Sequence, residues 1–211
     1  MSPILLRIVV IIAALGVWFW TQKLISRKST AAEGLGDAVH RWTAGWHHYF
    51  LTHEKPANRA LALSSLGIDV LGLSLITTAI FGPSFAPFLA ILIVFSLRQI
   101  SQLCCTLPPP PGMIWRDPGT PTALVTYGVS NDFFFSGHTS LAVLGAIEIC
   151  HLAPWWLGVL AVLLAVAEAL IVLVLRAHWT LDVITGALAA AVAADLAGRW
   201  APTVDAWWRF S

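Results

Sequence analysis

The chain has 211 residues, of which 58% are hydrophobic and 11% are charged, and its mean hydropathy is +0.79. This composition is too apolar for a water-soluble domain, so we expect an integral multi-pass membrane protein. The net charge of +1 gives no indication of a nucleic-acid partner.

Six apolar runs approach or reach the roughly 20 residues needed to cross the hydrocarbon of a bilayer. They predict an all-α, six-transmembrane-helix bundle, in which residues 1–59 form the first helix and a polar interfacial segment and residues 60–211 form a five-helix core. Tryptophans near the run ends, such as Trp18, Trp20, Trp155 and Trp179, are typical of interfacial belts. The fourth run is short, and we expect its helix to begin before His138. The runs are 4–25, 60–81, 85–107, 138–152, 155–175 and 183–200.

The polar stretch between the first two runs mixes aromatic residues with histidines at 39–50. His47 and His48 are adjacent and His53 follows, which suggests a metal site. Adjacent side chains on a helix point apart, however. We therefore favour an amphipathic helix in the membrane interface over metal binding.

Four prolines at 108–111, followed by Gly112, cannot continue the third helix. They open a loop of roughly thirty residues, and a loop of that length in a compact bundle is usually functional. The loop ends at the motif Asp132-Phe-Phe-Phe-Ser136-Gly137-His138-Thr139. A histidine thus opens the fourth apolar run.

A second histidine motif, Arg176-Ala-His178-Trp-Thr-Leu-Asp182, precedes the last apolar run. His178 and Asp182 are four residues apart, so on a helix they would share a face, and the carboxylate could accept a hydrogen bond from the imidazole. That pairing fixes the tautomer and raises the basicity of the free ring nitrogen, as a nucleophilic or general-base histidine requires. Alternation of six helices across the membrane places both motifs at the same end. We therefore expect His138, His178 and Asp182 to form one site.

Four charged residues lie within the apolar runs, nine or ten positions from the end that carries these motifs. At about 1.5 Å of rise per residue they would share a layer roughly 15 Å below the surface. Intramembrane charges tend to pair, so we expect Arg98 to contact Glu148, Glu168 or both. A structural network explains this layer at least as well as a catalytic or transport role. Its members are Asp69, Arg98, Glu148 and Glu168.

The motifs at 135–139 and 178–182, together with the segment 98–108, resemble those of the sphingomyelin synthase-like branch of the type-2 phosphatidic acid phosphatase (lipid phosphate phosphatase) superfamily. The Lys-x6-Arg-Pro and Ser-Arg motifs typical of the phosphatase branch are absent, which favours the synthase-like branch. The resemblance implies a six-helix bundle of this type and an enzyme without a cofactor or a metal ion.

The resemblance also implies roles for the site residues. His178, oriented by Asp182, would be the nucleophile of a phosphohistidine-type intermediate. His138 would protonate the departing diacylglycerol-like oxygen and then deprotonate the acceptor hydroxyl. Asp132 is placed to orient His138 or to bind a choline-like head group. The phosphate would be bound by the N-terminus of the helix that begins near Ser136 and by basic side chains. The candidates for binding the phosphate, or for supporting the residues that do, are Asp132, Ser136, Gly137, Arg98, Arg116 and Arg176.

The leading prediction is a lipid phosphotransferase that moves the phospho-head group of a membrane phospholipid to the hydroxyl of another lipid. The acceptor would be ceramide or diacylglycerol. Sphingomyelin synthases and ceramide phosphoethanolamine synthases catalyse reactions of this kind. A lipid phosphate phosphatase or phospholipase C-type hydrolase, with water as the acceptor, is the alternative. A metal enzyme with a site of His138, His178 and Asp182 and a transporter using the buried charges stay open. An oligomer is compatible with the sequence.

The orientation in the membrane has two opposed indications. The end that bears the motifs carries eight basic residues against two in the C-terminal flank, which by the positive-inside rule places it in the cytoplasm. The resemblance implies the outer, periplasmic or lumenal face. Because a basic segment bound to anionic lipid would explain the excess, we expect the outer face. The eight residues are Lys23, Arg27, Lys28, Arg41, Lys55, Arg59, Arg116 and Arg176, and the two are Arg199 and Arg209.

Overall fold

The computed structural model describes residues 3–27, 36–125, 127 and 133–209. The structure is 77% helical, and its described residues contain no strand, so the predicted all-α fold is confirmed. The helices are α1 (Pro3–Ile25), α2 (Ala38–Trp42), α3 (Ala44–Thr52), α4 (Glu54–Phe81), α5 (Ala86–Cys104), α6 (Gly137–Leu152), α7 (Trp155–Val174) and α8 (Thr180–Arg209).

Five of these helices, α1, α4, α5, α7 and α8, are long and apolar enough to span a membrane. The chain is therefore a multi-pass membrane protein, but the predicted count of six spanning helices is not confirmed. The fourth apolar run, residues 138–152, forms α6, which has only 16 residues. It begins at Gly137, one residue before His138, because Ser136 caps it: the side chain of Ser136 accepts a hydrogen bond from the backbone N–H of Thr139.

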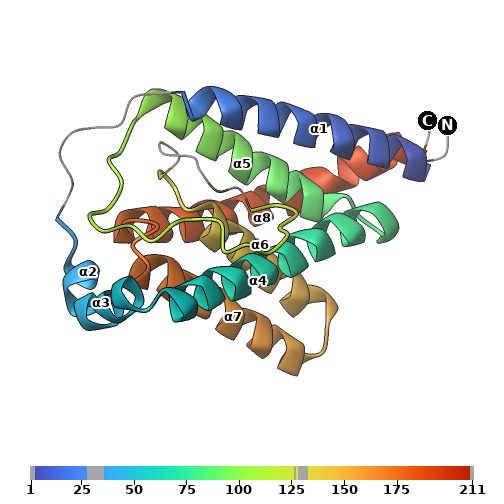
Figure 1. Cartoon of the computed structure of the whole chain (residues 1–211). Coiled ribbons are helices and arrows are strands. Elements are labelled where there is room, and N and C mark those ends of the chain that lie inside the picture. The colour runs from blue at the N-terminus through green and yellow to red at the C-terminus, as the bar shows by residue number, and fades with distance from the viewer. Residues whose placement is uncertain (1–2, 28–35, 126, 128–132, 210–211) are drawn as a thin grey trace.

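Helix α6 packs against α4, α7 and α8, while α1 lies along α5 on the outside (Figure 1). Small residues allow the close approach of α6 and α8. At Gly186 of α8 an added Cβ would lie 2.7 Å from the carbonyl oxygen of Ser136. The hydroxyl of Ser140 donates to the carbonyls of both Ser136 and Gly186. The two histidine motifs are thus joined directly where these helices meet.

Both termini and the α4–α5 and α6–α7 turns lie at one end of the bundle (Figure 1). The short helices α2 and α3, the start of α4 and the α7–α8 turn lie at the other end, together with the loop that follows α5. This is the arrangement that alternation of the apolar runs predicted. It brings the two histidine motifs to the same end.

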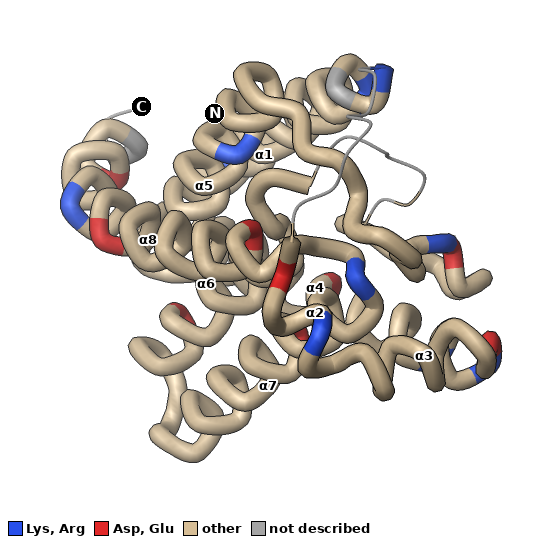
Figure 2. The backbone as a smooth tube through the Cα atoms, turned by 90° about the vertical axis from the view of Figure 1, so that its left-hand side faces the viewer, with Lys and Arg blue, Asp and Glu red and all other residues tan. Residues whose placement is uncertain are grey.

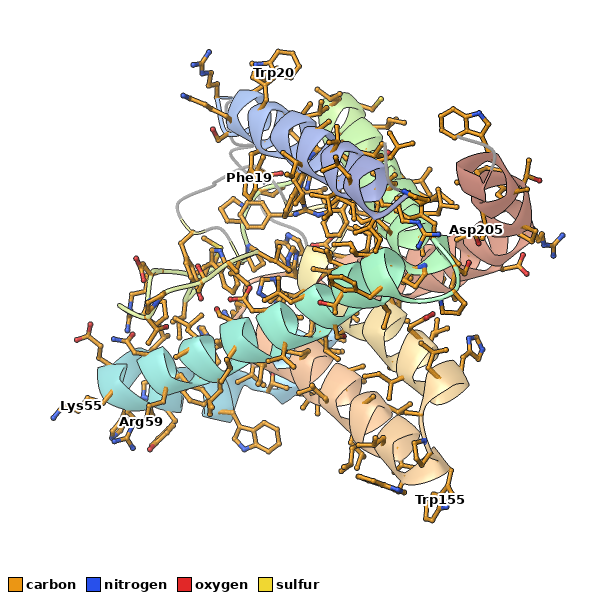
Figure 3. All side chains as sticks on the ribbon, turned by 90° about the vertical axis from the view of Figure 1, so that its right-hand side faces the viewer. Phe19, Trp20, Lys55, Arg59, Trp155 and Asp205 are labelled. Atoms are coloured by element: carbon orange, nitrogen blue, oxygen red, sulfur yellow. The ribbon has the colours of Figure 1, made fainter. Side chains whose placement is uncertain are left out.

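The tryptophans at helix ends divide into two groups. Trp20 and Trp155 point away from the bundle and are exposed (Figure 3), as expected for residues of an interfacial belt. Trp179 is instead buried and donates a hydrogen bond to the carbonyl of Pro108. Trp18 lines a pocket inside the bundle. For these two the belt prediction is wrong.

Candidate active site

His138 and His178 line one small pocket, of about 50 Å³, within the bundle. The walls come from α1, α4, α5, the loop after α5, the start of α6 and the turn before α8. The N-terminal segment therefore takes part in the site, since Trp18 and Gln22 of α1 line it. The remaining lining residues are Ile68, Phe95, Arg98, Trp115, Leu124, Val125, Phe133, Gly137, Leu141 and Ala177.

His178 lies in the turn before α8, so it does not share a helical face with Asp182 as the spacing predicted. Its Nδ1 is 2.8 Å from the carbonyl oxygen of Phe133 and 3.6 Å from Oδ2 of Asp182. The direct hydrogen bond goes to the carbonyl, while Oδ2 of Asp182 accepts the backbone N–H of Trp179 at 2.9 Å. Two acceptors beside Nδ1 favour the tautomer with the proton there. Nε2 of His178 then keeps its lone pair.

His138 is the second residue of α6. Its ring meets Trp115 edge to face, with centroids 5.0 Å apart. Among the described residues its Nε2 is buried and has no hydrogen-bond partner. Buried polar atoms in native proteins nearly always have one, so an unpartnered ring nitrogen in a pocket is a candidate acid or base for a bound oxygen.

Ser136 and Gly137 have different functions at the start of α6. Ser136 is fully buried, caps the helix and donates its backbone N–H to the carbonyl of Asp182 at 3.1 Å, so it joins the two motifs instead of facing the pocket. Gly137 lines the pocket. The helix N-terminus there offers free N–H groups and the positive end of a helix dipole, which suit a phosphoryl group.

Of the three candidate cations, Arg98 is the one that the structure brings to the histidines. It is buried, lines the pocket and donates from Nε to the carbonyl of Phe135 at 2.7 Å. Arg176 donates to the carbonyl of Pro111, and Arg116 to the side chain of Asn58. Neither lines the pocket. The candidate Asp132 lies outside the described residues.

The predicted layer of buried charges is not assembled as expected. Asp69 accepts the backbone N–H groups of Ala123 and Leu124, each at 2.8 Å. Glu168 accepts the hydroxyl of Ser64 at 2.6 Å, and Glu148 lies half-buried on α6. Asp69, Glu168 and Arg98 thus bond to different groups among the described residues. For Asp69 the reason is that the loop after α5 folds back over α4 and supplies N–H donors that the sequence pattern did not reveal.

Two histidines that the sequence pattern did not connect with the site hold the His178 turn from outside. His40 of α2 lies with Nε2 at 3.0 Å from the carbonyl of His178, and its ring stacks on Trp179. His47 of α3 lies with Nδ1 at 2.9 Å from the carbonyl of Val174. Burial lowers the pKa of both histidines, so both are neutral at pH 7 and donate an N–H to these carbonyls. Because they lie on separate helices, α2 and α3, helical periodicity does not mark them as a pair.

Asp37 was also missed, although an aspartate directly before a helix is a common N-cap. Its Oδ1 accepts the N–H of Val39 at 2.9 Å and the hydroxyl of Thr180 at 2.8 Å, and its Oδ2 accepts the N–H of Thr180 at 2.6 Å. One carboxylate therefore caps both α2 and α8. The first turn of α8 is fixed by Asp37 from outside and by Asp182 from within.

We expect Asp37→Ala to destabilise the protein by about 2–4 kcal/mol, because it removes the caps of two helices. Thermal unfolding in detergent measures this loss. Burial raises the pKa of Asp37, but the hydrogen bonds from Thr180 and His40 outweigh it and hold the pKa below 3.8. The stabilisation is therefore present above pH 3.8 and lost as the pH falls through the lowered pKa.

The matched control is Glu54→Ala, which removes an exposed carboxylate at the start of α4 that pairs with Arg116. Exposed ion pairs contribute little, so this change should cost less than about 1 kcal/mol. Equal losses from the two variants would contradict the capping role of Asp37.

In the described part of the chain, no group of three or more histidine, cysteine, aspartate or glutamate side chains is arranged to hold a metal ion. In particular, Nδ1 of His178 faces the carbonyl of Phe133 and Asp182 caps α8. The geometry therefore does not support the alternative of a two-histidine, one-carboxylate metal site.

Comparison with protein families gives a match to the family AtPDCT1/2, whose model covers residues 40–199 and so includes both histidine motifs. Neither the curated proteins nor the solved structures contain a match. The match overturns the assignment to the sphingomyelin synthase-like branch of the phosphatidic acid phosphatase superfamily, which was wrong. Motifs of five residues reflect the chemistry of a site, and they do not separate families that share it.

Proposed function

The chain belongs to the AtPDCT1/2 family of phosphatidylcholine:diacylglycerol cholinephosphotransferases, and we propose that it moves phosphocholine from phosphatidylcholine to the hydroxyl of diacylglycerol. The observation that carries the proposal is the pair of histidines in one pocket. His178 has its Nδ1 between two acceptors, and Nε2 of His138 is buried without a partner among the described residues. A nucleophile and a proton carrier are what two successive phosphoryl transfers require.

In the first half-reaction, the lone pair on Nε2 of His178 attacks the phosphorus of phosphatidylcholine. The bond between phosphorus and the diacylglycerol oxygen breaks, and its electron pair leaves with that oxygen. His138, which becomes protonated when the anionic phosphodiester lies beside it, gives its Nε2 proton to the same oxygen. The products are diacylglycerol and a phosphocholine group bound to His178.

In the second half-reaction, neutral His138 takes the proton from the hydroxyl of an acceptor diacylglycerol. The oxygen attacks phosphorus, the phosphorus–nitrogen bond breaks, and its electron pair returns to Nε2 of His178. Water in place of the lipid hydroxyl would make the enzyme a hydrolase. Access of water to the pocket is thus what separates the two activities.

The groups around the histidines supply the electrostatics of these steps. Arg98 and the N–H groups at the start of α6 stabilise negative charge on the phosphoryl oxygens. The phosphorylated His178 ring is cationic, and Oδ2 of Asp182 at 3.6 Å from Nδ1 stabilises it. Trp115 and Phe133 line the pocket and offer aromatic faces for the quaternary ammonium of choline.

The test uses purified protein in liposomes with chelator present. The donor is phosphatidylcholine with a deuterated head group, and the acceptor is diacylglycerol with distinct acyl chains. Mass spectrometry should find new phosphatidylcholine that joins the deuterated head group to the acceptor's chains. Free deuterated phosphocholine formed without need of an acceptor would indicate the hydrolase instead, and turnover of neither kind would overturn the proposal.

The predicted orientation in the membrane changes as well. The expectation of an outer face rested on the resemblance to sphingomyelin synthases, which the family match overturns. Seven of the eight basic residues counted in the sequence, all but Lys28, are described, and Lys and Arg are spread around the end that carries the site (Figure 2). By the positive-inside rule, we propose that the site faces the cytoplasm.

Cysteine labelling checks this orientation after Cys104, Cys105 and Cys150 have been replaced by serine. In sealed vesicles with the cytoplasmic face outside, a membrane-impermeant maleimide should label Lys55→Cys, an exposed position in the first turn of α4 at the site end. It should not label His151→Cys, an exposed position in the last turn of α6, next to the α6–α7 turn at the opposite end. The reverse pattern would place the site on the outer or lumenal face.

A further inference from the structure

A second cavity, of about 440 Å³, lies between α1, α4 and α5. Its lining is almost entirely apolar, with Leu15 and Trp18 of α1, Gly72 and Ile76 of α4, and Ile91 and Leu92 of α5 among the walls. A space of this size is in the range of ligand sites, roughly 300–1,000 Å³. The pocket of the histidines, at about 50 Å³, has room only for the reacting groups.

The two spaces adjoin. Trp18, Phe95, Leu124 and Leu141 line both the apolar cavity and the pocket of His138 and His178. A lipid whose phosphorus lies at His178 would therefore place its glycerol ester and the start of an acyl chain against these shared walls. The space behind those walls has the apolar character that an acyl chain needs.

From this continuity we infer that the apolar cavity binds an acyl chain of the diacylglycerol body of the substrate. The inference rests on the proposed function, in which the product that leaves the first half-reaction and the acceptor of the second are both diacylglycerols. One chain site is then enough for both half-reactions. Diacylglycerol released from the donor and diacylglycerol arriving as acceptor occupy the same cavity in turn.

Leu124 lines both the apolar cavity and the histidine pocket, and two contacts fix its position between them. Its backbone N–H donates to Oδ1 of Asp69 at 2.8 Å. Its side chain packs on Gly72, where an added Cβ would come within 2.3 Å of Cδ1 of Leu124. The buried carboxylate of Asp69 thus holds the loop residue that divides the chain site from the histidines.

Photo-crosslinking tests the site without relying on turnover. The probe is diacylglycerol with a diazirine near the end of one acyl chain, incorporated into liposomes with the full chain or with the His178→Ala variant. Peptide mapping should find the label on residues 14–21 of α1 and 91–100 of α5, and excess unlabelled diacylglycerol should remove it. Label confined to the outer faces of α7 and α8 would overturn the chain site.

A cavity-filling variant with a matched control sharpens the test. Leu92→Trp places an indole in the cavity and should lower the crosslink yield at least five-fold. Leu97→Trp, on the exposed face of α5 and outside both spaces, should leave the yield unchanged. Equal yields from the two variants would also overturn the inference.

Transfer assays with acceptors of different chain length distinguish failure of the acyl-chain site from failure of the proposed function. Leu92→Trp should lower transfer to long-chain diacylglycerol and retain transfer to a six-carbon-chain diacylglycerol, whose chains do not need the cavity. An equal loss on both acceptors would contradict the chain site. Specific crosslinking to 14–21 and 91–100 without any transfer by the unmodified chain would leave the chain site standing and overturn the proposed function.

Discussion

His178→Ala will abolish phosphocholine transfer, with a loss on the order of 10⁴-fold or more, because it removes the covalent nucleophile, while His138, the other histidine of the described pocket, serves as the proton carrier. The loss should extend to any hydrolysis of phosphatidylcholine, since both reactions pass through the same intermediate. Turnover of the head-group-labelled donor, followed by mass spectrometry, measures both activities.

The intermediate itself can be trapped. Phosphatidylcholine offered to the unmodified chain without an acceptor should leave a phosphocholine mass on the peptide that contains His178, stable in base and labile in acid. His151→Ala, which removes an exposed histidine at the far end of α6, is the matched control and should retain full activity. Normal transfer by a folded His178→Ala variant would contradict the assignment of the nucleophile.

His138→Ala should lower transfer between natural lipids by about 10²–10⁴-fold, the usual contribution of a general acid or base. The loss should depend on the leaving group. p-Nitrophenyl phosphocholine releases an anion that needs no proton, so its first half-reaction, followed as a burst of nitrophenol, should fall less than about 10-fold. This difference follows from the unpartnered Nε2 of His138 in the pocket.

The control for this experiment is His178→Ala, which should release no nitrophenol from the same compound. If His138→Ala loses equal activity on the natural lipid and on the nitrophenyl ester, then His138 positions the site and does not carry the proton of the leaving group.

Much of the architecture could be predicted because a membrane leaves few choices. Backbone N–H and C=O groups must be satisfied within each spanning segment, so apolar runs of sufficient length become helices. Counting those runs was enough to place the motifs of His138 and His178 at one end. The boundary at Gly137 was close to the prediction because a capping serine is a local signal.

The local arrangement of the second motif could not be predicted in the same way. The four-residue spacing of His178 and Asp182 predicted a shared helical face, but the helix begins at Thr180 between them. The carboxylate then caps the first turn and lies 3.6 Å from the imidazole. The spacing of residues could not predict this, because helical periodicity indicates that a segment is helical but does not give the residue at which the helix begins.

What the sequence by itself determined is a helical membrane bundle, the end at which the site lies, and the two histidines that meet there. The tertiary structure decided which cation joins them, which partner satisfies Asp69, and how Asp37 and His40 fix the turn of His178. The reason is distance along the chain: His40 reaches the carbonyl of His178 across 138 residues, and Asp37 reaches Thr180 across 143. Such contacts arise only when helices pack, and no local pattern in the sequence encodes them.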